Sequence, residues 1–357
     1  MEQGRLSTRV RVVEPGAEDG PVVLEAGAVL RAGGLVAFPT ETVYGLGASA
    51  LDEQAVAGIF KAKGRPADNP LIVHIDSFAS LGQYFPLITE RVRLLAAHFW
   101  PGPLTLVLKG GDRFPAVVSG GLGTVAVRVP AHPVALALIR AAGVPVAAPS
   151  ANVSGGPSPT TAAHVLDDLD GRIDLVLDGG PAGLGVESTV LDLSGALPVI
   201  LRPGGVTPRQ LEAVLGPVKL DPAVNGASGD AKPRSPGMKY THYAPRAPVV
   251  LFDGDNRAGI VKRILAEAEN MAARGQRVGI LTCRDNELMY QGRGYAVIAT
   301  GWRDDPGSIA AALYESLRCF DRRSVDAILA EGVPAKGLGL AVMNRLLRAA
   351  GGNVIKI

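Results

Sequence analysis

The sequence predicts an α/β protein with two domains. Short apolar segments of strand length alternate with helical patterns along most of the 357 residues, which is typical of α/β folds. Over residues 216–247 this periodicity stops, and Pro, Gly, Ser and Asp dominate, as in a linker. The chain is long enough for two domains, which we expect at 1–215 and 248–357.

The first domain is expected to hold one large, twisted, mixed sheet, because its elements do not follow a strict βαβ order. After the linker, segments such as PVVLF and RVGIL alternate regularly with helical patterns, which predicts a small Rossmann-like domain. The predicted helices of the first domain span 22–32, 53–62, 89–98, 133–142, 160–168 and 208–215. Its predicted strands span 34–38, 71–75, 104–108, 125–129, 144–148, 175–177, 189–193 and 199–201.

The composition argues against several classes of protein. A net charge of +2 and 5% aromatic residues do not favour a nucleic-acid surface. Cys283 and Cys319 lie far apart and the five histidines are scattered, so neither a disulfide framework nor a zinc site is predicted. The N-terminus lacks the apolar core of a signal peptide, and no apolar run reaches membrane-spanning length. We therefore expect a cytoplasmic protein.

The stretch AFPTETVYGLGA, residues 37–48, changes from an apolar strand to a loop rich in hydroxyl groups. Such a loop at a strand end is suited to bind a small polar molecule. Further along, Lys63 and Arg65 flank Gly64 and project from a turn that Pro66 stiffens. Closely spaced Lys and Arg suit a polyphosphate. A helix C-cap is the alternative, because cations and Gly are also expected there.

Two charged or titratable side chains fall on predicted strands. His74 alternates with Val73 and therefore faces away from the apolar side of its strand, as a hydrogen-bonded core residue or a ligand contact. Arg128 shares a face with the small Ala126, which leaves space in front of its guanidinium. That arginine is either a carboxylate-binding residue or an ordinary solvent-facing one.

A strand ending at Ala148 leads into a loop of small and polar residues that contains Ser150 and Asn152. Loops that run from a strand end to a helix N-terminus are natural anion and nucleotide sites. Helix capping and turn chemistry are the alternative. They explain Ser158, Pro159 and Thr160 well, but they do not explain the Ser-x-Asn pair.

Ser188 and Arg202 lie at the ends of two later predicted strands, and alternation places Arg202 on the face of Ile200. Each is a weak signal alone. No phosphate-binding GxxxxGK[ST], GxSxG, HExxH or kinase motif is present. KGLGLA at 336–341 is interpreted as a helix entry and not as a dinucleotide-binding motif.

Taken together, PTETVYGLG, KAKGRP, NPLIVHI, PSAN, ESTV and RPG occur in an order that resembles the threonylcarbamoyl-adenylate synthase family. The linker motif SPGMKYTHYAP and the following tail resemble its long, two-domain form. The resemblance covers roughly residues 20–350 and implies a YrdC-like N-terminal domain. It implies that L-threonine, bicarbonate or CO2, and ATP with Mg²⁺ are converted to threonylcarbamoyl-AMP and pyrophosphate. A separate transferase would then modify adenosine 37 of tRNA.

The resemblance also implies site residues, and the sequence shows no departure from the family pattern at these positions. Arg128 would hold the substrate carboxylate, while Thr40 and Glu41 shape the turn. Lys63 and Arg65 would neutralise phosphate charge as the catalytic residues, and no dedicated general base is apparent. The threonine contacts would be Thr42, His74, Arg128, Ala148 and Ser188. The nucleotide contacts would be Lys63, Arg65, Asn69, Thr124, Ser150, Asn152, Ser158 and Arg202.

The linker carries the motif KYTHYAP in an otherwise featureless tether. We predict that it folds back over the active site and that Tyr243 contacts the nucleotide; an inert spacer is the alternative. An RNA-binding module, including one for double-stranded RNA, is a further alternative function. Another carbamoyl or acyl adenylate is a third, because one methyl group discriminates threonine from serine by only ~1–3 kcal/mol.

Overall fold

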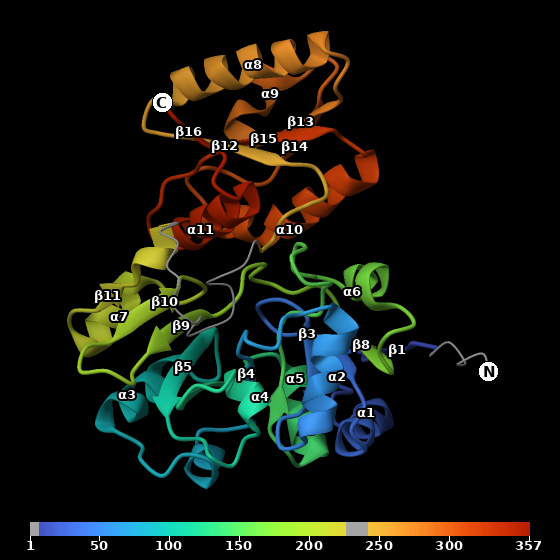
Figure 1. The fold of residues 1–357 in the computed structure, drawn as a ribbon, viewed down its shortest axis with the longest axis vertical. Helices are drawn as coiled ribbons and strands as arrows, with labels where there is room; N and C mark the ends of the chain where they lie inside the picture. Colours follow the sequence, from blue (N-terminus) through green and yellow to red (C-terminus); the bar gives the residue numbers. More distant parts are fainter. Residues whose placement is uncertain (1–6, 226–241) are drawn as a thin grey trace. The chain divides into compact units, whose positions relative to one another are not determined.

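The computed structural model describes residues 7–225 and 242–357, which form two compact units (Figure 1). Among the described residues, the first unit comprises 7–154 and 158–221. The second comprises 155–157, 222–225 and 242–357. Most of the predicted linker, 226–241, lies outside the described residues. A search of the described part of the chain finds no helix long and apolar enough to cross a membrane.

The first unit is built on a large mixed sheet, as predicted. In the described chain its strand order is β1-β8-β2-β3-β7-β4-β6-β5-β9-β10-β11. Eight of the strands were predicted, whereas β1, β3 and β11 were not. The strands are β1 (Arg9–Val12), β2 (Val36–Phe38), β3 (Gly45–Ser49), β4 (Ile72–His74), β5 (Leu104–Lys109), β6 (Thr124–Arg128), β7 (Val146–Ala147), β8 (Leu175–Asp178), β9 (Thr189–Asp192), β10 (Val199–Arg202) and β11 (Lys219–Leu220).

The helices of the first unit agree with the six predicted ones, and the short α4 is additional. Helix α2 shows why their limits were readable from the sequence. It begins at Asp52, whose carboxylate accepts from the amides of Gln54 and Ala55, and it ends at Gly64 with a φ of 62°. The helices are α1 (Pro21–Arg31), α2 (Glu53–Lys63), α3 (Glu90–Phe99), α4 (Ala116–Ser119), α5 (Pro133–Ala142), α6 (Ala162–Leu169) and α7 (Pro208–Leu215).

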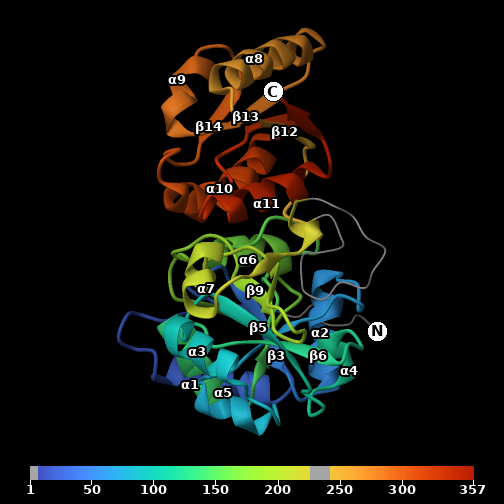
Figure 2. The same cartoon turned by 90° about the vertical axis from the view of Figure 1, so that its left-hand side faces the viewer.

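One face of this sheet is buried under α2, α3, α4, α6 and α7. Helices α2 and α4 contact each other on that side (Figure 2). Because side chains alternate along a strand, successive residues belong to different cores. In β4, Val73 joins the core under these helices, whereas Ile72 faces the other way.

The opposite face is covered unevenly, and this difference positions the site. Helices α1 and α5 pack together over β2, β7 and β8. Over β4, β5, β6, β9 and β10 the buried apolar cluster is small. Polar residues share that face by alternation, including His74, Thr105 and Arg128. The small cluster consists of Ile72, Val107, Ala126, Val190 and Leu201.

The second unit is a Rossmann-like parallel sheet with the order β14-β13-β15-β12-β16. Figure 1 shows α8 and α9 on one side of it and α10 and α11 on the other. The strands are β12 (Val249–Asp253), β13 (Val278–Thr282), β14 (Ala296–Ala299), β15 (Ala327–Glu331) and β16 (Val354–Lys356). The helices are α8 (Arg257–Ala273), α9 (Glu287–Tyr290), α10 (Pro306–Arg323) and α11 (Gly339–Ala350).

A buried carboxylate lies at the C-terminal end of β15. Glu331 is 3% exposed, and it accepts hydrogen bonds from the hydroxyls of Thr282 at 2.7 Å and Tyr290 at 2.5 Å and from the amide of Asn286 at 2.9 Å. Burial, and next the charge of Glu331, raises the pKa of the nearby Cys283 thiol to about 11. These donors stabilise the carboxylate inside the unit.

Candidate active site

The turn between β2 and β3 is held together by its own hydroxyl groups. Thr40 Oγ1 donates to the carbonyl of Val43 at 2.6 Å and accepts from the amides of Thr42 and Val43, each at 3.2 Å. It also lies 2.7 Å from Thr42 Oγ1. Thr40 and Thr42 are both buried. The predicted hydroxyl-rich loop is therefore a rigid turn of Pro39–Tyr44, after which the chain returns at once as β3.

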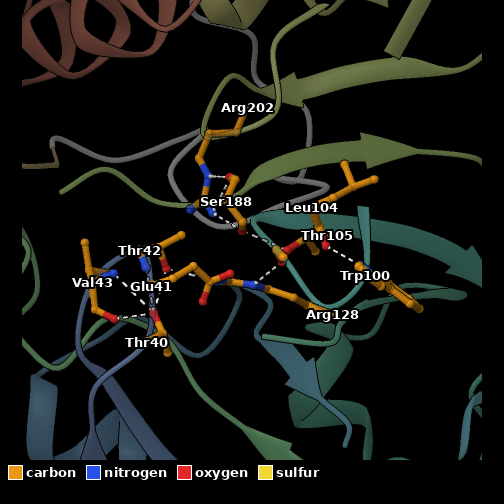
Figure 3. A network of polar contacts seen from close by, with 11 residues as sticks. Thr40, Glu41, Thr42, Val43, Trp100, Leu104, Thr105, Arg128, Ser188 and Arg202 are labelled. Carbon is orange, nitrogen blue, oxygen red and sulfur yellow. Dashed lines mark hydrogen bonds and ion pairs between the residues drawn. The ribbon is translucent and has the colours of Figure 1, made fainter. Parts of the chain in front are cut away.

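Arg128, at the end of β6, lies beside this turn and is 3% exposed. Its Nη1 donates to Thr42 Oγ1 at 3.1 Å, and its Nε donates to the carbonyl of Gly102 at 3.1 Å. Its Nη2 lies 2.6 Å from Oε1 of Glu41. Figure 3 shows the Glu41 carboxylate directed toward the guanidinium. Arg128 is thus a buried cation, and the alternative of a solvent-facing arginine is wrong.

Ser188 connects this region to β5 and β10. Its hydroxyl lies 2.8 Å from Thr105 Oγ1. Arg202 Nη2 donates to the Ser188 carbonyl at 3.0 Å and to its hydroxyl at 3.2 Å (Figure 3). A register shift between Ile200 and Arg202 interrupts the alternation of β10. Arg202 contacts Ser188, which in turn contacts Thr105 on the face opposite Ile200. The prediction that Arg202 and Ile200 share a face is therefore wrong.

The glycine of the RPG motif permits this arrangement. A Cβ on Gly204 would lie 2.3 Å from the carbonyl oxygen of Glu187 and 2.4 Å from the carbonyl carbon of Ser188. Main-chain atoms cannot yield as a flexible side chain does, so only glycine allows the two segments to approach this closely. The ESTV and RPG motifs are thus parts of one packed structure.

His74 is 4% exposed, and its ring packs edge-on against Phe38 with centroids 6.3 Å apart. Burial lowers its pKa to about 3, and the charge of Arg128 contributes in the same direction. The imidazole is therefore neutral at physiological pH. Its predicted place, facing away from Val73, is confirmed, since Val73 belongs to the core beneath the other face.

Lys63, which was predicted to project from the turn at Gly64, directs its side chain inward from the last turn of α2. It is 2% exposed. Its Nζ donates to the main-chain carbonyl of Ser150 at 2.6 Å and also to that of Asn152. Burial, and next the charge of Arg65, lowers the pKa of Lys63 well below its ordinary value. The lysine thus joins the two sequence motifs that the family resemblance assigned to the nucleotide.

Arg65 and the remaining predicted residues are placed by local contacts. Arg65 Nη2 donates to the carbonyls of Asn69 at 3.3 Å and Pro70 at 3.0 Å, so it folds back over its own loop. Ser158 is buried and donates to Glu187 Oε1 at 2.5 Å. The amide of Ala148 donates to the carbonyl of Ile72, beside His74. Thr124 begins β6 and is half-buried.

Several buried polar atoms in this region have no hydrogen-bond partner within the described structure. They are both carboxylate oxygens of Glu41, Nη2 of Arg128, Nδ1 of His74 and Oδ1 of Asn69. The close approach of Glu41 and Arg128 lacks hydrogen-bond geometry. Folded proteins rarely leave buried polar atoms unpaired, because each costs about 1–3 kcal/mol. A polar ligand would satisfy these atoms.

Sequence reasoning missed Thr105 as a member of this network, and it assigned Glu41 only to the turn. Thr105 interrupts the otherwise apolar LTLVL, which was an available signal. The direction of the Glu41 side chain depends on the turn and could not be read from alternation.

Tyr243 lies in the second unit. Its ring packs against that of Tyr314, with centroids 5.5 Å apart, and lies 5.1 Å from the guanidinium carbon of Arg345. It is 6% exposed and has a φ of 66°, which is uncommon for a tyrosine. Its contact with a nucleotide stays a prediction.

Comparison with known proteins gives the relationship. The chain is 49% identical to the threonylcarbamoyl-AMP synthase of Bacillus subtilis over 97% of its own length and 98% of that relative. The chain belongs to the threonylcarbamoyl-AMP synthase family. This confirms the resemblance identified in the sequence motifs.

Other members of the threonylcarbamoyl-AMP synthase family agree. The synthase of Pyrococcus abyssi is 50% identical over 95% of this chain and 97% of its own. The crystal structure of P. abyssi Sua5 complexed with L-threonine superposes with a TM-score of 0.92 at 49% identity, covering 98% of this chain and all (100%) of that one. Residues 28–204 match the family described as "Telomere recombination", and 206–351 match the "Threonylcarbamoyl-AMP synthase, C-terminal domain".

Proposed function

We propose that this protein forms L-threonylcarbamoyl-AMP from L-threonine, bicarbonate or CO2, and ATP, and releases pyrophosphate. The observation that carries the proposal is the buried Arg128. Its Nη1 donates to the hydroxyl of Thr42, and its Nη2, although 2.6 Å from Glu41 Oε1, makes no hydrogen bond. The names of the synthases with 49% and 50% identity support the reaction. The P. abyssi structure complexed with L-threonine supports the substrate.

The amino-acid substrate is assigned to the region around Arg128. A buried guanidinium binds a carboxylate strongly, since the charge-assisted hydrogen bonds are little screened. Thr42 and Ser188 supply hydroxyls, and the neutral His74 supplies a ring nitrogen without a partner. We assign L-threonine to Thr42, His74, Arg128, Ala148 and Ser188.

The nucleotide is assigned to the neighbouring loops, and Mg²⁺ arrives with ATP as part of the substrate. Lys63 holds the Ser150–Asn152 loop through its carbonyls. Its charge, together with that of Arg65, would offset the charge that develops on the phosphates. We assign ATP to Lys63, Arg65, Asn69, Thr124, Ser150, Asn152, Ser158, Arg202 and Tyr243.

The chemistry has two steps. The threonine amine adds to CO2 to form a carbamate, and a carbamate oxygen then attacks the α-phosphorus of ATP. The new bond joins that oxygen to phosphorus, and pyrophosphate leaves with the electron pair of the broken bond. Such a displacement depends mainly on positioning and charge neutralisation. The product would pass to a separate transferase that modifies adenosine 37 of tRNA.

The test is pyrophosphate release from the purified full chain with ATP and Mg²⁺, with threonine and bicarbonate each present or omitted. Release that requires both substrates supports the proposal. Release with neither substrate, or none at all, contradicts it. Arg128→Ala should raise the threonine KM strongly, whereas Arg209→Ala, an exposed arginine of α7, should leave it unchanged. Serine in place of threonine tests the alternative amino-acid substrate.

A further inference from the structure

Glu41 has an unusual position in this site. Its side chain is 21% exposed, yet both of its carboxylate oxygens are buried and lack a hydrogen-bond donor. The backbone on both sides is fixed. The amide of Leu184 donates to the Glu41 carbonyl at 2.8 Å, and that of Gly185 donates to the Thr42 carbonyl at 3.1 Å. The turn therefore holds this carboxylate in the site.

Arg128 forms an ion pair with this carboxylate but makes no hydrogen bond to it. Arg128 uses Nε for Gly102 and Nη1 for Thr42. Its Nη2 lies 2.6 Å from Glu41 Oε1 but outside hydrogen-bond geometry. The site therefore holds a close, buried ion pair in which Nη2 of Arg128 and both carboxylate oxygens of Glu41 make no hydrogen bond.

This pattern is complementary to an α-amino acid in its zwitterionic form. The ligand carboxylate supplies the acceptor for Arg128, and the adjacent ammonium supplies three N–H donors for Glu41. A zwitterion adds no net charge, so one ion pair is replaced by two without burying an unpaired charge. A ligand that carried only a carboxylate would instead place two anions beside one guanidinium.

We propose that Glu41 binds the ammonium group of the amino-acid substrate and accepts its proton. This inference rests on the proposed function and deepens it. An N–H bond of the ammonium breaks, the proton bonds to a carboxylate oxygen of Glu41, and the electron pair stays on nitrogen. That pair then forms the N–C bond to CO2, and a second proton passes from nitrogen to water as the carbamate forms. Glu41 thus supplies the base that the sequence motifs did not identify.

The experiment compares two ligands by calorimetry on the full chain: L-threonine and (R)-3-hydroxybutyrate, which is threonine without its amine. The wild type should prefer threonine. Glu41→Gln should weaken threonine binding by roughly tenfold or more, because a neutral amide cannot form the ion pair. The same variant should bind (R)-3-hydroxybutyrate with the wild-type affinity or more tightly, because the Glu41 carboxylate no longer repels the carboxylate of the ligand. Glu53→Gln, on the exposed first turn of α2, is the matched control and should change neither affinity.

The kinetic readout separates binding from proton transfer. At saturating threonine, Glu41→Gln should lower the kcat of pyrophosphate release by about tenfold or more and leave the ATP KM unchanged. If Glu41→Gln weakened the binding of threonine and of (R)-3-hydroxybutyrate equally, Glu41 would only position Arg128, and the inference would fail. It would fail too if the variant kept the wild-type threonine affinity or the wild-type kcat. In each of these cases the proposed function still stands, provided that the wild-type protein releases pyrophosphate only when threonine and bicarbonate are both present. A wild type without threonine-dependent release refutes the proposed function itself.

Discussion

The ammonium group of Lys63 donates a hydrogen bond of 2.6 Å to the main-chain carbonyl of Ser150. The two residues are separated by 87 positions in the sequence. Lys63 comes from the end of α2, and Ser150 from the loop after β7. The Lys-x-Arg and Ser-x-Asn motifs are therefore coupled, and a change in the lysine should disturb the loop before any substrate is present.

Lys63→Met tests this coupling. Methionine fills a similar volume but leaves the carbonyls of Ser150 and Asn152 without their donor, so the first unit should lose about 2 kcal/mol of unfolding free energy. The protein contains two tryptophans, so Trp302→Phe leaves Trp100 as the fluorescent reporter of the first unit during urea unfolding. Lys61→Met, exposed on the same helix, should cost little. Equal stability of the two variants would contradict the coupling.

The buried His74 makes the stability of the first unit depend on pH. Its pKa is about 3 in the folded chain, against an ordinary value of 6.5 that applies to the unfolded chain. Below pH 6.5 the unfolded chain therefore binds a proton that the folded chain does not. Stability is fully present above pH 6.5 and falls as the pH drops toward 3. By about pH 5 the loss should be about 2 kcal/mol.

The measurement for His74 is urea unfolding at several pH values in the same Trp302→Phe background. His74→Gln cannot titrate, so its stability should fall less between about pH 7 and pH 5 than that of the parent. If the unfolding free energy changed with pH equally in both proteins, folding would not lower the pKa of His74, and the prediction would be wrong.

Gly204→Ala should be strongly destabilising. The added Cβ would collide with the main chain of Glu187 and Ser188, and backbone overlap of this kind costs about 3 kcal/mol or more. Gly183→Ala is the control in the same unit, because no atom lies within 4 Å of its added Cβ. Thermal unfolding of the two variants gives the comparison, and a Gly204→Ala protein as stable as the control would refute the close packing of ESTV and RPG.

Cys283 should be an unreactive thiol in the folded protein. Its pKa of about 11 leaves little thiolate at about pH 8, so alkylation by iodoacetamide should be roughly 100-fold slower than for an unperturbed cysteine. The measurement uses Cys319→Ser, which leaves Cys283 as the remaining cysteine of the two. Adding urea should restore the ordinary rate. A fast reaction without denaturant would show that the second unit opens around β13.

The sequence predicted the first unit well wherever the pattern was local. The limits of α2 followed from Asp52 and Gly64, and the face of Arg128 followed from alternation with Ala126. β1 was missed because RVRV has charged residues and lies at the sheet edge, beside β8. β3 was missed because GLGAS contains two glycines and reads as a loop.

The site was less predictable than the fold, because its contacts depend on distant segments. Helical spacing from Ile59 and Phe60 places Lys63 on the buried face of α2, a signal that sequence reasoning did not use. The carbonyls that hold its side chain inward are 87 and 89 positions away and could not be read from the sequence. The bulge at Arg202 broke the period on which its predicted face relied. The orientation of Glu41 arises from the turn and from its contact with Leu184, far away in the sequence.

The strand order also has a consequence for biosynthesis. Thr42 meets Arg128 across 86 positions, and Thr105 meets Ser188 across 83. Arg202 in turn contacts Ser188, so a nascent chain cannot complete this network until residue 202 has been synthesised. At ~5–20 residues per second, synthesis to that point takes about 10–40 s. During that interval β5 lacks its later neighbour β9, so its unpaired edge is exposed early in translation and is available to chaperones that bind exposed strands.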